Sequence, residues 1–149
     1  MLRFSSILLR KIKSNKKESK LLKQFAVWKK QQEQSVENNA TEKKILIIRL
    51  DDIGDYILFR NFLNVYKNAA RWKNYSLTLL GNFVWKDLFE KFDATAVDSV
   101  MWIDKKQYFK SEDYRKKTWI ELQSQGFEIV ICPSRTRPLL LDDLCALAT

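Results

Sequence analysis

The chain has 149 residues, of which 46% are apolar and 13% aromatic, so it can bury a core and does not belong to the disordered class. It contains no histidine, which excludes Ser–His and Cys–His catalysis and zinc sites built on histidine. Its two cysteines, Cys132 and Cys145, are too few for a disulfide framework and are predicted to be core thiols. No run of about 18 apolar residues occurs, so no membrane-spanning helix is expected. We therefore predict a soluble, cytoplasmic protein whose acid–base chemistry would rest on carboxylates, Lys, Tyr or Cys.

Positive charge is concentrated at the N-terminus. The formal net charge is +9, and residues 1–40 hold ten basic against three acidic residues, a net +7, which leaves +2 for residues 41–149. From Leu21 to Trp28 apolar residues recur at helical spacing with lysines on the other face, which predicts a basic amphipathic helix. Residues 31–41 are polar and predict a linker, so we expect an arm over 1–40 and a domain over 41–149.

Several roles fit such an arm. A basic amphipathic helix can lie on an anionic membrane surface, contact nucleic acid or pack on its own domain. It can also be no more than a solvated helix. The apolar run at Ile7–Leu9 is shorter than the apolar core of a signal peptide, so a secretory signal is not expected.

The remainder alternates strand and helix patterns. Short apolar runs predict strands, and longer stretches with helical spacing predict helices between them. The expected strands are 45–50, 76–80, 99–103 and 127–132, and the expected helices are 55–70, 83–92, 112–125 and 139–148. For the first helix, the apolar face is predicted to carry Leu58, Phe62, Val65, Tyr66 and Ala69. This alternation indicates a Rossmann-like parallel α/β sheet with right-handed crossovers.

The loop after the first strand carries the clearest candidate site. It reads Asp51-Asp52-Ile53-Gly54-Asp55, with three carboxylates and one glycine, at a strand end where open α/β sheets bind ligands. Asp55 could take a proton from a substrate hydroxyl, while Gly54 and Asp52 would contact the substrate. The alternative is that Asp55 only caps the following helix. The loop lacks both the G-x-G-x-x-G and the P-loop patterns, so dinucleotide binding has no support.

The segment from Lys44 to Leu58 (KILIIRLDDIGDYIL) resembles the opening of glycosyltransferase family 9, the ADP-heptose:lipopolysaccharide heptosyltransferases. Members of that family begin with an apolar strand, an Arg or Lys, a short loop and then Gly-Asp. The segments Gly126–Ile131 and Leu144–Ala148 look like the family's fourth strand and the helix after it. The resemblance covers about residues 43–149.

This resemblance implies the N-terminal, acceptor-binding half of a GT-B enzyme made of two Rossmann-like halves. It implies a nucleotide-sugar donor bound by a C-terminal half, a glycan or lipid-linked acceptor, no metal or other cofactor, and Asp55 as general base. Two features depart from the family. Asn61 stands where a proline is common, and nothing corresponds to the donor half, so we expect a piece of a larger enzyme or one of two chains.

Other residues have both functional and structural interpretations. Arg135 and Arg137 follow the fourth strand and could bind a phosphate or carboxylate of the acceptor, although solvated loop arginines are as common. Tryptophans could stack on sugars but are more often core; they are Trp72, Trp85, Trp102 and Trp119. Lys105-Lys106 and Lys116-Lys117 are expected on solvated faces.

Two functional hypotheses follow. The first is the acceptor half of a metal-independent, inverting glycosyltransferase that is peripheral on the inner membrane through its basic arm. The second is a non-enzymatic α/β binding module whose arm docks on nucleic acid or a partner protein, of which we regard nucleic acid as the less favoured. A phosphoacceptor receiver domain is excluded by spacing and by the missing Lys-ending fifth strand.

Overall fold

The computed structural model describes residues 16–32, 42–134 and 138–149, and it divides the chain into two units, 1–37 and 38–149. In the first unit, α2 spans Lys16–Gln32, which confirms a helix in the basic arm. Phe25 and Trp28 lie on one face of α2 with ring centroids 5.5 Å apart. The predicted first half of the arm, residues 1–15, and most of the predicted linker lie outside the described residues.

The second unit is built on a four-stranded, all-parallel sheet, as the strand–helix alternation predicted, and its strands lie in the order β3-β2-β1-β4. The strands are β1 (Lys44–Arg49), β2 (Ser76–Asn82), β3 (Ser99–Ile103) and β4 (Ile129–Ile131). Ile47 of β1 pairs with Leu79 of β2 on one side and with Ile131 of β4 on the other. Because β1 is interior, its residues 45–49 are buried, which explains their continuous apolar run.

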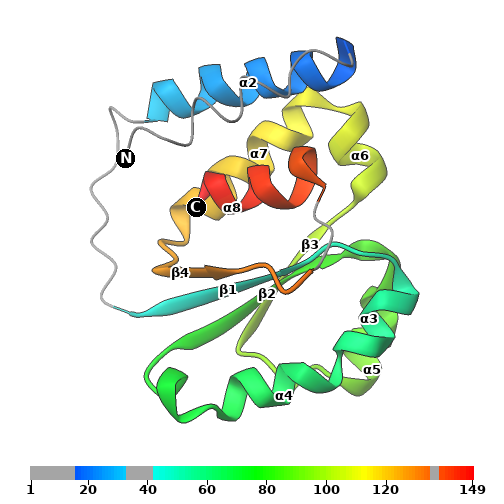
Figure 1. The fold of residues 1–149 in the computed structure, drawn as a ribbon, viewed down its shortest axis with the longest axis vertical. Coiled ribbons are helices and arrows are strands. Elements are labelled where there is room, and N and C mark those ends of the chain that lie inside the picture. Colours follow the sequence, from blue (N-terminus) through cyan, green and yellow to red (C-terminus); the bar gives the residue numbers. More distant parts are fainter. Residues whose placement is uncertain (1–15, 33–41, 135–137) are drawn as a thin grey trace. The chain divides into compact units, whose positions relative to one another are not determined.

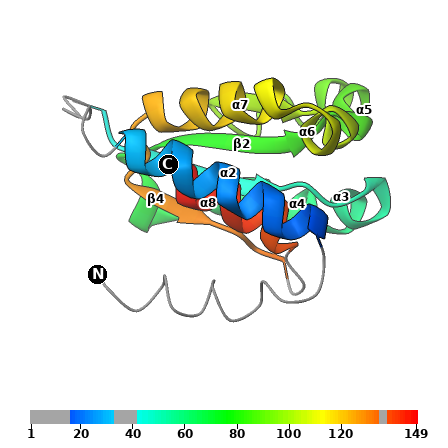
Figure 2. The same ribbon diagram turned by 90° about the horizontal axis from the view of Figure 1, so that it is seen from above.

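Helices cover both faces of the sheet (Figure 1). One face carries α3 (Ile53–Phe59), α4 (Asn61–Asn68), η1 (Ala70–Trp72), η2 (Phe83–Trp85) and α5 (Lys86–Phe92). The other carries α6 (Lys105–Lys110), α7 (Glu112–Ser124), the π-helical turn η3 (Leu139–Asp143) and α8 (Leu144–Ala148). In Figure 2, α7 runs along the direction of the strands. No described helix is long and apolar enough to cross a membrane.

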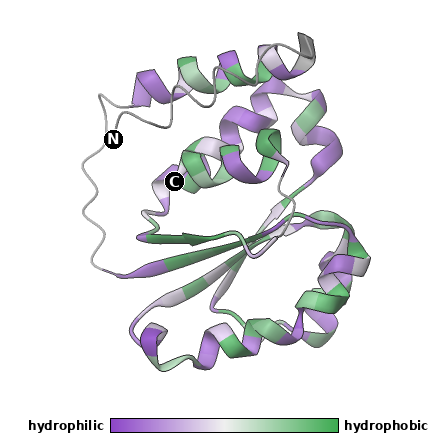
Figure 3. Cartoon of the chain, viewed as in Figure 1, coloured by the Kyte–Doolittle hydropathy of each residue, from purple (hydrophilic) through white to green (hydrophobic). Residues whose placement is uncertain are grey.

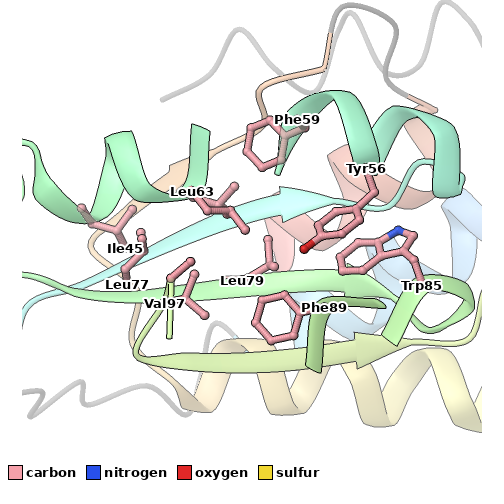
Figure 4. Close-up of a cluster of buried hydrophobic side chains, with 11 residues drawn as sticks. Ile45, Tyr56, Phe59, Leu63, Leu77, Leu79, Trp85, Phe89 and Val97 are labelled. Carbon is pink, nitrogen blue, oxygen red and sulfur yellow. The ribbon is translucent and has the colours of Figure 1, made fainter. Parts of the chain in front are cut away.

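A buried aromatic cluster fixes α3 and α5 to the sheet (Figure 4). Tyr56 stacks on Trp85 with ring centroids 4.0 Å apart and an interplanar angle of 6°. The Tyr56 hydroxyl donates to Asp93 Oδ2 at 2.6 Å, and Arg60 makes two hydrogen bonds to the same carboxylate, at 2.8 and 2.9 Å. Burial, followed by the contact with Asp93, raises the pKa of the Tyr56 phenol, so the ring stays neutral and packs as a core residue.

The first crossover departs from its prediction in two ways. The single predicted helix over 55–70 is broken at Arg60 into α3 and α4, although Arg60 itself keeps helical dihedrals. The predicted buried face is also wrong, because Leu58, Phe62 and Val65 are exposed. Both sides of the segment are apolar, and the buried side is the one carrying Tyr56, Phe59 and Leu63.

Other boundaries shift by a few residues. The structure extends β2 to Asn82, reduces the fourth strand to three residues, and adds α6, which the sequence reading missed. Asp104 starts α6 by accepting from the backbone amides of Lys106 and Gln107 at 2.8 and 3.1 Å. The core interpretation of Trp85, Trp119 and Cys145 is confirmed, whereas Trp72, Trp102 and Cys132 are only half-buried.

Candidate functional site

The candidate site lies where the carboxyl ends of β1 and β4 meet. The crossover leaving β1 leads to β2 on one side, and the crossover leaving β3 returns to β4 on the other side. In open α/β sheets such a change of direction leaves a crevice beyond the strand ends, and ligands bind there. The segments that border this position are residues 50–52 after β1, which lead into the first turn of α3, and residues 132–134 after β4.

Arg49, the last residue of β1, ties these two loops together. Its side chain is 9% exposed, and its Nη2 lies 2.8 Å from Asp51 Oδ2. Its Nη1 donates to the Pro133 carbonyl oxygen and to Ser134 Oγ, both at 3.1 Å. Ser134 Oγ in turn donates to Asp51 Oδ2 at 3.2 Å, which closes a ring of three side chains. Hydrogen bonds in which one partner is charged are stronger than those between neutral groups. This ring of contacts therefore fixes the position of one loop relative to the other.

The backbone of the β1 loop is also held by β2. The Asp51 carbonyl oxygen accepts from Asn82 Nδ2 at 3.0 Å and from Trp85 Nε1 at 3.2 Å. Asn82 and Trp85 are buried, so these two donors come from fixed side chains. The loop that carries the candidate base is therefore anchored from both of the strands that flank β1.

Asp55 lies in the first turn of α3 and is exposed. Asp52, and not Asp55, occupies the N-cap position, and neither side chain makes a capping hydrogen bond. The carboxylate of Asp55 makes no hydrogen bond or ion pair with any residue that the structure describes, but its backbone carbonyl accepts from Arg49 Nη2 at 3.3 Å. A carboxylate with free lone pairs on a fixed backbone has the geometry that a general base requires.

Asp52 and Gly54, the other two residues of this segment that are predicted to bind substrate, differ in how accessible they are to a ligand. Asp52 is paired with Lys105, with Oδ1 2.7 Å from Nζ, so its carboxylate is already engaged. A methyl group added at Gly54 would meet no atom within 4 Å, so the space beside the glycine is open. Gly54 therefore lets a ligand approach the backbone closely. The packing around Gly54 would also accommodate an alanine.

Two cavities border the sheet at opposite ends. One of 260 Å³ lies at the carboxyl ends of the first three strands, beside the Asp52–Lys105 pair. Its lining residues are Asp52, Asn82, Phe83, Val84, Asp104, Lys105 and Lys106. A second of 420 Å³ lies at the amino ends of the strands, lined by Trp72 and Tyr75 and by Tyr66 and Lys67 of α4, on the same face of the sheet as α3. Strand polarity favours the first as the ligand cleft; Asp52 lines it, whereas Asp55 is not among its lining residues.

Asp142 is a buried carboxyl near this site that sequence reasoning missed. It is 2% exposed, sits in the π-helical turn η3, and its Oδ1 has no hydrogen-bond partner among the residues that the structure describes. Burial raises the pKa of Asp142 to about 6, with further contributions from the charges of Asp51 and Asp143. π-Helical turns are frequent at functional sites, so the turn in η3 draws attention to Asp142. The sequence pattern does not reveal such a turn, and only the structure shows it.

Arg135 and Arg137 lie outside the described residues, so their predicted contact with an acceptor stays a prediction. Within the described part of the chain, no group of three His, Cys, Asp or Glu side chains could hold a metal ion. Cys145 offers no nucleophile, because its burial raises the pKa of the thiol and keeps it protonated.

Comparison with known proteins adds no relative. No protein-family model, no curated protein and no solved structure matches the chain. The resemblance to glycosyltransferase family 9 therefore rests on the sequence segments that carry it.

Proposed function

We propose that this chain is the acceptor-binding half of a metal-independent, inverting glycosyltransferase of the family 9 type. The observation that carries the proposal is the placement of Asp55. Its carboxylate is exposed, makes no hydrogen bond or ion pair with the described residues, and stands in the first turn of α3, just beyond the carboxyl end of an interior strand and beside the change of direction in the sheet. The sequence motif around Gly54-Asp55 is the one on which the family resemblance depends.

The proposed reaction has one displacement. Asp55 accepts the proton of an acceptor hydroxyl, and the oxygen then attacks the anomeric carbon of the sugar in a nucleotide-sugar. The bond from that carbon to the leaving nucleoside diphosphate breaks as the new glycosidic bond forms, so the configuration inverts. The donor would be held by a second Rossmann-like half, which this chain does not provide.

The basic arm suggests where in the cell the proposed enzyme would act. In the proposed enzyme, α2 with the lysines around it would hold the chain at the cytoplasmic face of the inner membrane, where lipid-linked acceptors are found. Such binding would be electrostatic and would weaken as the salt concentration rises.

Acceptor binding tests the part of the reaction that this chain would perform. Titration of the ¹⁵N-labelled chain with a deacylated lipopolysaccharide core oligosaccharide should shift the amide signals of residues 51–56 and of Ser134. Duplex DNA of similar charge serves as the comparison. Shifts produced by the DNA and not by the oligosaccharide would replace this proposal with a nucleic-acid-binding module.

A further inference from the structure

The first crossover presents an apolar strip to solvent. We define the apolar strip as Ile57, Leu58, Phe62 and Val65, whose exposed fractions are 51%, 77%, 55% and 63%. Leu58 and Phe62 are four residues apart and Val65 follows three later, and the helical dihedrals of Arg60 (φ −51°, ψ −34°) carry the helical path across the break. Figure 3 shows hydrophobic segments along α3 and α4. Single exposed apolar residues are ordinary, but a cluster of this kind marks an interaction surface.

Charge differs between the two ends of the apolar strip. Before it Asp52 and Asp55 are exposed, whereas from Tyr56 to Tyr75 the sequence has four basic residues and no acidic residue. Two of them are engaged, Arg60 with Asp93 and Lys67 with Asp98. The other two, Arg71 and Lys73, are exposed and make no ion pair within the described ranges.

Aromatic residues lie among these basic residues. The Arg71 guanidinium lies 4.0 Å from the ring centroid of Trp72, which is half-buried. The Lys43 ammonium lies 5.5 Å from the ring of Tyr75, so a third basic residue reaches the same end of the unit. The unit therefore has exposed apolar side chains on α3 and α4 and, where the crossover returns to β2, exposed cations over aromatic rings.

We propose that the apolar strip, together with Arg71 and Lys73, docks this domain on the surface of an anionic phospholipid bilayer. Apolar side chains enter the boundary between headgroups and acyl chains, aromatic residues sit at headgroup level, and cations attract anionic lipid. The remaining exposed positions of α4 include the neutral amides Asn61 and Asn64, which can hydrogen-bond to headgroups. This docking surface belongs to the folded domain and not to the arm, and it stands whether or not Asp55 is catalytic.

Vesicle partitioning of the full chain tests the docking surface. The vesicles are phosphatidylcholine alone or with about 30 mol % phosphatidylglycerol, which gives an anionic surface. The triple variant Leu58→Gln, Phe62→Gln, Val65→Gln should bind the anionic vesicles about tenfold or more weakly, because less apolar surface enters the lipid. The matched control Phe109→Gln, Ile120→Gln changes two residues that are 49% and 51% exposed on α6 and α7, and it should bind like the parent. Arg71→Gln, Lys73→Gln should weaken binding to the anionic vesicles alone.

The arm has to be separated from the strip, since it would also hold the chain on anionic lipid. The same comparison is therefore repeated in a full chain whose α2 lysines Lys16, Lys17, Lys20 and Lys23 are changed to Gln. Equal partitioning of the triple variant and its parent in both backgrounds would overturn the proposal. So would a triple variant that sediments as a monomer where the parent sediments as a dimer, because that result assigns the strip to a protein contact. If the triple variant does not fold, Leu58→Gln alone, at the most exposed of the four positions, makes the same comparison.

Discussion

Arg49 joins the residues that directly follow it to the Pro133–Ser134 segment, 84 residues further along the chain, and this single side chain accounts for much of the geometry of the candidate site. Its guanidinium contacts Asp51, the Pro133–Ser134 segment and the backbone of Asp55, and it lies 4.6 Å from the ring of Phe59. An arginine can do this because its planar fork presents several donors at once, which a lysine ammonium cannot. The basic residue in the family-like motif is thus explained here by loop anchoring.

Replacing Arg49 should destabilise the domain. Arg49→Met removes four polar contacts and leaves Asp51 half-buried without its ion pair, so we expect the free energy of unfolding to fall by about 3 kcal/mol in urea titrations. Asp51→Asn added to Arg49→Met should recover part of that loss. The exposed Arg71 gives the control, because Arg71→Met should change the stability by no more than about 0.5 kcal/mol. Additive effects of the Arg49 and Asp51 changes would contradict the anchoring role.

Asp55 should be required for chemistry and not for folding. In an assay with the donor half present, Asp55→Asn is expected to lower kcat by about 10²–10⁴-fold, the usual contribution of a general base. The KM for the acceptor and the thermal unfolding midpoint should hardly change, since the Asp55 carboxylate makes no hydrogen bond or ion pair to the rest of the described chain. Asp87→Asn is the matched control, because Asp87 is an exposed aspartate in the first turn of α5. Turnover that survives in Asp55→Asn would remove the catalytic assignment.

At the scale of elements, the sequence predicted the four strands and their parallel arrangement, because apolar runs between helical patterns leave few alternatives, but not their order in the sheet. It did not predict which side of α3 and α4 faces the core, since Leu58, Phe62 and Val65 are as apolar as the residues that are buried instead. The choice depends on a long-range contact, the hydrogen bond from Tyr56 to Asp93, which no local pattern encodes. Of the candidate site, the choice of Asp55 follows from a motif and stays a prediction, while the Arg49–Ser134 contact and the burial of Asp142 depend on tertiary packing.

Two glycines that follow strands should respond oppositely to alanine. At Gly81 an added methyl group would lie 2.5 Å from the Trp85 ring and 2.6 Å from the Trp102 ring, so Gly81→Ala should cost about 1–3 kcal/mol of stability. At Gly54 nothing lies within 4 Å, and alanine favours a helix, so Gly54→Ala should be neutral or stabilise by up to about 1 kcal/mol. Urea unfolding measures both.

The same pair also tests the ligand role of Gly54. If an acceptor approaches the backbone there, Gly54→Ala should weaken binding of the core oligosaccharide while the domain keeps its full stability. Unchanged binding would show that the open space beside Gly54 is not used.

In the molecule as a whole, burial and hydrogen bonding shift the pKa values of different carboxyl groups in opposite directions. Asp98 and Asp104 have pKa values below the ordinary range. For Asp98, burial raises the pKa, but the hydrogen bond from the Leu77 amide, together with Lys67, lowers it by more. For Asp104, the hydrogen bond from the Gln107 backbone amide is the main cause of the lowered pKa. Each lowered pKa adds stability that is lost as the pH falls through the folded-state value. Asp142 acts in the opposite direction, because its pKa is raised by burial inside the α8 side of the sheet. The pH profile of stability is thus a sum of opposing contributions, and only a difference between variants isolates one of them.

Asp142→Asn should therefore change how stability depends on pH. The ordinary carboxyl pKa is near 3.8 and that of folded Asp142 is about 6, so the folded state binds this proton more tightly than the unfolded state does. Its contribution is complete below about pH 4 and is lost as the pH rises through about 6, so an ionised Asp142 costs roughly 2–3 kcal/mol at pH 8. We expect Asp142→Asn to be more stable than the parent at pH 8 and to lose that advantage by pH 4, in urea titrations across this range. Glu121→Gln, at an exposed position of α7, should follow the parent at every pH. Parallel curves of stability against pH for Asp142→Asn and the parent would contradict this prediction. They would show that Asp142 has an ordinary pKa and is more accessible to water than the structure indicates.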